Sequence, residues 1–180
     1  FQRGDPRFWQ AVVGGAIDVV EGAGSALTVT YLINGTNKAV SLSAGGFLTL
    51  PGGGIDTGNA NLSLSSGTDL SISQALHGNN ISLSAANALS IAANVIADGT
   101  LALLNTNGAS VASVRSQVTS GSDMTVNLAG GLHVETASGG TVGQLFSSGL
   151  QTINAKYVEV ISSGTGGAQM VSGLTVFGVL

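Results

Sequence analysis

Large apolar residues alternate with small polar ones in short phrases that recur from about Val40 to Val134. Typical phrases are Leu62-Ser63-Leu64 and Ile81-Ser82-Leu83, set off from their neighbours by Gly or Asn. A first series of phrases begins at residues 40, 62, 81, 101 and 124, and a second series begins at residues 48, 70, 89, 111 and 132. Both series therefore advance by a nearly constant step. Two parallel series with the same step predict a chain that winds once per repeat.

The alternation also predicts which side chains face inward. Within each phrase the Leu, Ile and Val residues lie on one face of a strand, and the small residues between them lie on the other face. Coils stacked about 4.8 Å apart would pair the backbone of each strand with the strands above and below it. We therefore predict an all-β protein, a parallel β-helix (β-solenoid) of about 20-residue coils over residues 26–180. An extended N-terminal arm and first strand would occupy residues 1–25.

The repeat is less regular near both ends of the sequence. Within Ala11–Val20 the two glycines disfavour a helix and the β-branched residues favour a strand. After residue 136, the phrases Leu150–Ile153 and Leu174–Val176 are spaced more widely than the earlier ones. This spacing predicts longer coils, or a corner insertion such as Ser138–Gly140.

Two other folds compete with the solenoid. The Ala-rich segment Ala85–Ala97 favours a helix, because Ala is the best helix former. Its phrase Leu89-Ser90-Ile91, however, falls in register with the second series and indicates a strand. A pilin-like β-sandwich is the main rival architecture, since regular short strands suit both folds. A sandwich does not predict two interleaved series with a common step.

Composition narrows the classes of function. The chain has 180 residues, of which 43% are hydrophobic and only 8% are charged, against roughly 25% charged in an ordinary soluble domain. This balance predicts that part of the outer surface is covered by another copy or by a partner. A net charge of −4 with five scattered basic residues argues against nucleic-acid binding, which needs clustered Lys and Arg. With no Cys and no apolar run long enough to span a bilayer, we expect neither disulfides nor a transmembrane helix.

Four aspartates, Asp56, Asp69, Asp98 and Asp123, are the candidates for acid–base chemistry, because polysaccharide-cleaving β-helices use clustered carboxylates. Such hydrolysis needs two carboxyl groups about 5–9.5 Å apart. Asp69, Asp98 and Asp123 each flank a turn, and turn chemistry explains them without catalysis. We therefore expect no catalytic residue and no enzyme activity.

The two histidines lie far apart in the sequence. His77 falls in the predicted turn Leu76-His77-Gly78, and His133 points outward beside Glu135. Two distant histidines without a third ligand do not make a metal site. The chain also lacks a nucleotide-binding loop pattern, so we expect no metal and no cofactor.

The segments Gly78–Ala93 (GNNISLSAANALSIAA) and Gly67–Ser73 (GTDLSIS) resemble repeats of filamentous-haemagglutinin-like surface proteins. The resemblance covers roughly residues 40–136. It implies a right-handed parallel β-helix that is secreted to the bacterial surface and has an adhesive or matrix role. That family's secretion signature has no match near the start of this sequence.

These features predict a structural subunit of a secreted extracellular filament or matrix fibre, located outside the cell or on its surface. Solenoid ends expose unpaired strand edges, and head-to-tail stacking of such ends gives an open filament. The N-terminal arm would add as a strand to a neighbour. Outward Ser, Thr, Ala and Asn residues would allow lateral bundling. We expect the partner to be the chain itself, through an interface of Phe1, Arg3, Phe8, Trp9, Val12, Val13, Leu174, Val176, Phe177 and Leu180.

Alternative functions rest on fewer features. A monomeric or trimeric glycan-binding adhesin or spike segment would use exposed aromatic residues, and only Tyr31, Phe47, Phe146 and Tyr157 lie in the middle of the chain. A polysaccharide-degrading enzyme ranks below it. The tripeptide Arg3-Gly4-Asp5 matches one that integrins bind on exposed loops, but a salt bridge within or between subunits also explains its charges.

Overall fold

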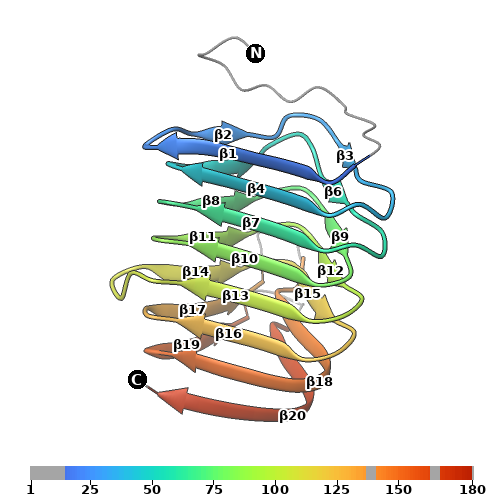
Figure 1. The fold of residues 1–180 in the computed structure, drawn as a ribbon. Coiled ribbons are helices and arrows are strands. Elements are labelled where there is room, and N and C mark those ends of the chain that lie inside the picture. Colours follow the sequence, from blue (N-terminus) through green and yellow to red (C-terminus); the bar gives the residue numbers. More distant parts are fainter. Residues whose placement is uncertain (1–14, 137–140, 163–166, 180) are drawn as a thin grey trace.

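The computed structural model describes residues 15–136, 141–162 and 167–179, which form a parallel β-solenoid of about seven turns (Figure 1). Every pairing between the described strands is parallel. The described residues contain no helix. The predicted fold class is therefore confirmed. A β-sandwich is excluded, because its sheets are built from antiparallel strands.

Each coil contributes strands to three faces, and strands on one face stack in chain order (Figure 1). The first face holds β1 (Ile17–Ala23), β4 (Val40–Gly45), β7 (Leu62–Ser66), β10 (Ile81–Ala85), β13 (Leu101–Asn105) and β16 (Met124–Leu128). The second face holds β2 (Leu27–Thr28), β5 (Leu48–Leu50), β8 (Leu70–Ile72), β11 (Leu89–Ile91), β14 (Val111–Val114), β17 (Gly131–Glu135) and β19 (Tyr157–Ile161). The third face holds β3 (Ile33–Asn34), β6 (Ile55–Asp56), β9 (Leu76–Gly78), β12 (Val95–Ala97) and β15 (Gln117–Ser120).

Two long strands, β18 (Gln144–Ala155) and β20 (Gln169–Val179), run from the third face onto the first. The beginning of β18 pairs with β15 and its end pairs with β16. β20 then pairs with β18 along both its third-face beginning and its first-face end. The chain passes from third face to first without leaving the strand conformation, so the two faces count as one continuous sheet.

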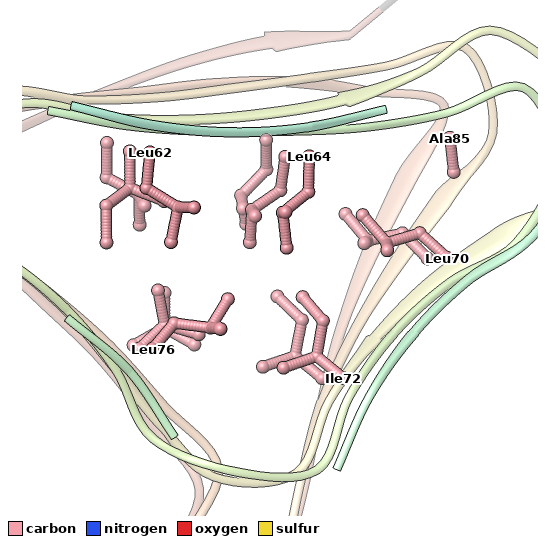
Figure 2. Close-up of a cluster of buried hydrophobic side chains, with 14 of the residues drawn as sticks. Leu62, Leu64, Leu70, Ile72, Leu76 and Ala85 are labelled. Carbon is pink, nitrogen blue, oxygen red and sulfur yellow. The ribbon is translucent and has the colours of Figure 1, made fainter. Parts of the chain in front are cut away.

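The interior is filled by columns of apolar side chains, one residue from each coil. Leu64, Leu83 and Leu103 are successive members of one first-face column, and all are at most 1% exposed. Figure 2 shows side chains from the three faces converging inside the coil. Burying one such side chain contributes about 1.5–3 kcal/mol. Repetition of these columns is what holds the coils in register.

The two series found in the sequence correspond to the first and second faces. The third face repeats as well, with inward residues Ile33, Ile55, Leu76, Val95, Val118 and Leu145. Its strands are only two to four residues long up to β15. This leaves little alternation to recognise, and the number of strands per coil had to come from the structure.

One phrase of the second series begins one residue later in the structure than the sequence predicts. The phrase Val111-Ala112-Ser113 suggested that Val111 points inward, but Ala112 pairs with Leu89 and is buried, as is Val114. The coil between these strands is one residue longer than the series implied. A shift of one residue exchanges the two faces of a strand, so Val111 and Ser113 lie outward.

The longer coil expected after residue 136 is confirmed by the pairing of Met124 with Gln151, a wider step in the sequence than that from Leu101 to Met124. Ser138–Gly140 lies outside the described residues. In the first coil, β1 begins at Ile17 and pairs with β4. The alternative helix over Ala85–Ala97 is wrong, because β11 and β12 occupy this segment.

Candidate functional site

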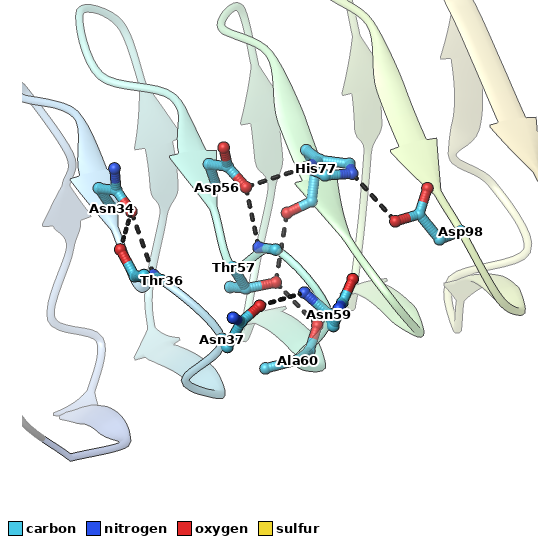
Figure 3. Close-up of polar contacts among 10 residues, drawn as sticks. Asn34, Thr36, Asn37, Asp56, Thr57, Asn59, Ala60, His77 and Asp98 are labelled. Atoms are coloured by element: carbon cyan, nitrogen blue, oxygen red, sulfur yellow. Dashed lines mark hydrogen bonds and ion pairs between the residues drawn. The ribbon is translucent and has the colours of Figure 1, made fainter.

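The most concentrated set of charges on the third face joins three successive coils (Figure 3). His77, on β9, lies between Asp56 on β6 and Asp98 just after β12. Its Nδ1 is 2.9 Å from Oδ1 of Asp56, and its Nε2 is 3.1 Å from Oδ2 of Asp98. His77 is a strand residue and not a turn residue as the sequence suggested. We call these three residues the third-face ladder.

The electrostatics of the third-face ladder favour a charged imidazolium. The hydrogen bond to Asp56 is the main cause that raises the pKa of His77, and Asp98 acts in the same direction. A hydrogen bond from the backbone N–H of Gly58 is the main cause that lowers the pKa of Asp56, followed by the bond to His77. Protonated His77 donates from both ring nitrogens, one to each neighbouring coil.

The third-face ladder is arranged to clamp coils together. Both nitrogens of His77 are occupied by carboxylates, so neither is free to take a proton from a substrate. Its side chains are more than a third exposed, and exposed ion pairs of this kind contribute about 0–1 kcal/mol each. Within the described part of the chain, no group of three or more His, Asp and Glu residues is arranged to hold a metal ion.

The other two candidate aspartates bind backbone groups of the next coil. Oδ1 of Asp69 accepts a hydrogen bond from the N–H of Ala88 at 2.9 Å. Oδ1 of Asp123 accepts one from the N–H of Leu150, also at 2.9 Å. The sequence predicted a turn role for both residues, and these corner contacts agree with it. Each carboxylate satisfies an N–H group at a corner between two faces of the solenoid.

A row of amide and hydroxyl side chains follows the corner between the third and first faces. Oδ1 of Asn61 accepts a hydrogen bond from Nδ2 of Asn80 at 3.1 Å. Oδ1 of Asn80 in turn accepts hydrogen bonds from the backbone N–H and the hydroxyl of Thr100, at 2.9 and 3.0 Å. Each hydrogen bond of this row joins one coil to the next. The side chains at this corner therefore hold neighbouring coils together, in addition to the backbone hydrogen bonds between strands.

A second charged cluster lies on the second face near the C-terminal end. Oε1 of Glu135 accepts hydrogen bonds from the Ser113 hydroxyl at 2.7 Å and from Nε of Arg115 at 2.6 Å. The Ser113 hydrogen bond is the main cause that lowers the pKa of Glu135, ahead of Arg115. Nε2 of His133 lies 2.9 Å from Oε2 of Glu159 in the next coil. His133 thus lies outward, as predicted, and contacts a carboxylate of the next coil that its sequence neighbours do not indicate.

The apolar interior is open at the C-terminal coil. Val160 on β19 pairs with Val134 on β17, so both side chains point toward the interior. Val134 is 0% exposed, whereas Val160 is 50% exposed. The only described strand that pairs with β19 is β17. The lower edge of β19 therefore offers both unpaired backbone groups and uncovered core surface.

The first coil differs from the last. Its inward residues Ile17, Leu27 and Ile33 are buried, and the inward Val19 is partly buried. Each of β1, β2 and β3 nevertheless pairs with only one other described strand. Among these inward residues, one as exposed as Val160 therefore occurs at the C-terminal coil and not at the first coil.

The predicted interface residues fall mainly at the two ends of the sequence. Leu174, Val176 and Phe177 lie in β20, the outermost described strand of the first face. Phe1, Arg3, Phe8, Trp9, Val12, Val13 and Leu180 lie outside the described residues. Their role in subunit contact stays a prediction. Val160, exposed on β19, is not singled out by the sequence, because an inward residue of a terminal coil has the same sequence pattern as one in the middle.

Comparison with known proteins finds no matching family model, no matching curated protein and no matching solved structure. In the part of the chain that the structure describes, no helix is long and apolar enough to cross a membrane. The class of the protein, a parallel β-solenoid, therefore rests on the fold alone.

Proposed function

We propose that this protein is a structural β-solenoid that assembles end to end into an extracellular filament or matrix fibre. The observation that carries the proposal is the exposure of the interior at β19, where Val160 is 50% exposed and its neighbour Val134 is fully buried. An uncovered core surface next to an unpaired strand edge favours the addition of another coil, which buries the side chains and pairs the backbone together.

The side walls suit a fibre in a second way. The outward column Ser41, Ser63 and Ser82 places a small hydroxyl side chain on each successive coil of the first face. Small side chains at a regular spacing leave a flat wall along the rod, which permits lateral packing between rods. This supports a fibre of bundled rods, with the end-to-end contact as its primary interaction.

The experiment compares two substitutions of similarly exposed apolar residues. Val160→Asp places a charge on the open end, and Ile96→Asp places one on the side wall, where Ile96 is 43% exposed. We expect rods of many subunits by negative-stain microscopy and fast sedimentation for the wild type and for Ile96→Asp. Val160→Asp should leave short particles. A wild-type protein that stays monomeric at high concentration refutes the proposal.

A glycan-binding function is the second candidate, and one observation favours it. Tyr157 is 41% exposed, and the centroid of its ring lies 5.7 Å from that of His133, beside the charged second-face cluster. An exposed aromatic ring next to hydrogen-bonding groups offers a sugar both an apolar face and polar contacts. Binding of immobilised polysaccharides that is lost in Tyr157→Ala, with filament formation unchanged, would favour this candidate.

A further inference from the structure

We propose that residues 6–13 of a second copy fill the positions below β19 and β20, so that the winding of one copy continues into the next. This inference rests on the proposed function and specifies its junction. Three features support it: the order of the faces at the C-terminal coil, the sequence spacing of residues 6–17, and the side chains that this register brings together.

The order of faces shows which positions a neighbour must supply. The last described strand, β20, ends on the first face, where it pairs with the final part of β18. The winding order is first, second and third face, so the next strands required are one below β19 and one below the start of β20. A first-face strand would follow them. The neighbour must therefore supply second, third and first faces in that order.

The sequence before β1 has the spacing of that order. In the third coil the inward residues Ile72, Leu76 and Ile81 mark the second, third and next first face, with steps of four and five residues. Phe8, Val12 and Ile17 have the same steps of four and five residues. Ile17 begins β1 on the first face. The spacing thus assigns Phe8 to a second-face position and Val12 to a third-face position.

The register then follows from matching inward residues. Phe8 of the second copy would lie below Val160, the exposed interior residue of β19. Val12 would lie below Met170, which pairs with the buried Leu145. Two open interior positions would each receive an apolar side chain, as in every other coil.

The outward residues are complementary in the same register. Arg7 would lie below Glu159, whose side chain is 53% exposed and touches His133 on its other side. Val13 would lie below Val171, which is 41% exposed. Directly opposed neighbours on adjacent strands stabilise each other when their charges are opposite or both are apolar. A shift by one residue would place Phe8 beside Glu159 and lose both matches.

Charge reversal tests this junction. Glu159→Arg and Arg7→Glu should each raise the concentration needed for filament formation by about fivefold, because each places like charges opposite one another. The double variant restores opposite charges and should return this concentration to near the wild-type value. Lys38→Glu is the control, since it makes the same change in net charge as Arg7→Glu at an exposed corner of the first coil.

Disulfide cross-linking gives an independent readout, because the chain has no Cys. Residues opposed on adjacent parallel strands lie about 4.8 Å apart, within the Cα separation that a disulfide allows. Arg7→Cys combined with Glu159→Cys should give a ladder of covalent oligomers on oxidation. Arg7→Cys with His133→Cys is the matched control, one coil away in the same column, and should not give a ladder.

The outcomes separate this inference from the proposed function. Wild-type filaments that show neither rescue by the double variant nor a cross-linked ladder overturn the junction and leave end-to-end assembly standing. Absence of wild-type filaments overturns both. A ladder from the His133 control in place of the Glu159 pair also overturns the register.

Discussion

Asn105 on β13 breaks the apolar pattern of the interior. It is 2% exposed, and neither its Oδ1 nor its Nδ2 has a hydrogen-bond partner in the described part of the chain. Its neighbours in the same column are Ala85 in the preceding coil and Leu128 in the following coil. A buried amide without partners costs about 1–3 kcal/mol of stability.

Replacing Asn105 with Leu removes this cost and places in the column the residue type found one coil further on. We therefore expect Asn105→Leu to raise the free energy of unfolding by about 1–3 kcal/mol. Asn127→Leu is the matched control, because Asn127 is an exposed Asn on the neighbouring first-face strand β16. Asn127→Leu should change the free energy of unfolding by no more than about 0.5 kcal/mol.

Urea unfolding followed by circular dichroism measures both variants, with the slope against urea checked for constancy. Asn105→Ala is a second test that guards against overpacking, since Ala stands in the preceding coil of the column. If both Asn105→Leu and Asn105→Ala lower the free energy of unfolding, the amide stabilises the fold and the reasoning is wrong.

Three further predictions concern the core, a corner and the third-face ladder. Leu83→Ala, at a fully buried position, should cost about 3–5 kcal/mol by urea unfolding, and Ser82→Ala on the outward side should cost less than about 0.5 kcal/mol. Gly67→Ala should lower the melting temperature, because a Cβ there would collide with backbone of the preceding coil, whereas Gly22→Ala has open space and should not. The pKa of His77 is raised in the folded state, so its ion pairs should stabilise fully below its ordinary pKa of 6.5 and weaken as the pH rises through the folded-state pKa. NMR titration should show that raised pKa, and His77→Gln should remove this part of the pH dependence; a titration at or below 6.5 contradicts the assignment.

The first and second faces could be recognised from the sequence because their strands carry repeated apolar residues at a spacing of two. The third face was missed although its inward residues recur at a similar step, since a two-residue strand such as Ile33–Asn34 shows no alternation. The register error at Val111 has a related cause. Coils on the first face differ in length, from the short step between Leu62 and Ile81 to the much longer one between Met124 and Gln151. Counting residues therefore does not determine which ones are opposed.

The contacts of the third-face ladder could be predicted from the sequence only if the length of each coil were known beforehand. His77 is 21 residues from both Asp56 and Asp98, which is close to one coil in each direction. The spacing becomes meaningful only when the coil length at that point is known. Asp69 and Asp123, which look equivalent in the sequence, bind backbone groups instead.

Local alternation is enough to predict a wound β structure with an apolar interior and a wall of small polar residues, because it sets the direction of each side chain in a strand. The number of faces, the partners of His77 and the end at which the interior is open follow from the three-dimensional arrangement of the coils. Those properties depend on which residues of neighbouring coils lie opposite each other. The backbone hydrogen bonds between coils can form in any register, and it is the burial of the apolar columns, together with the length of each coil, that selects one of them.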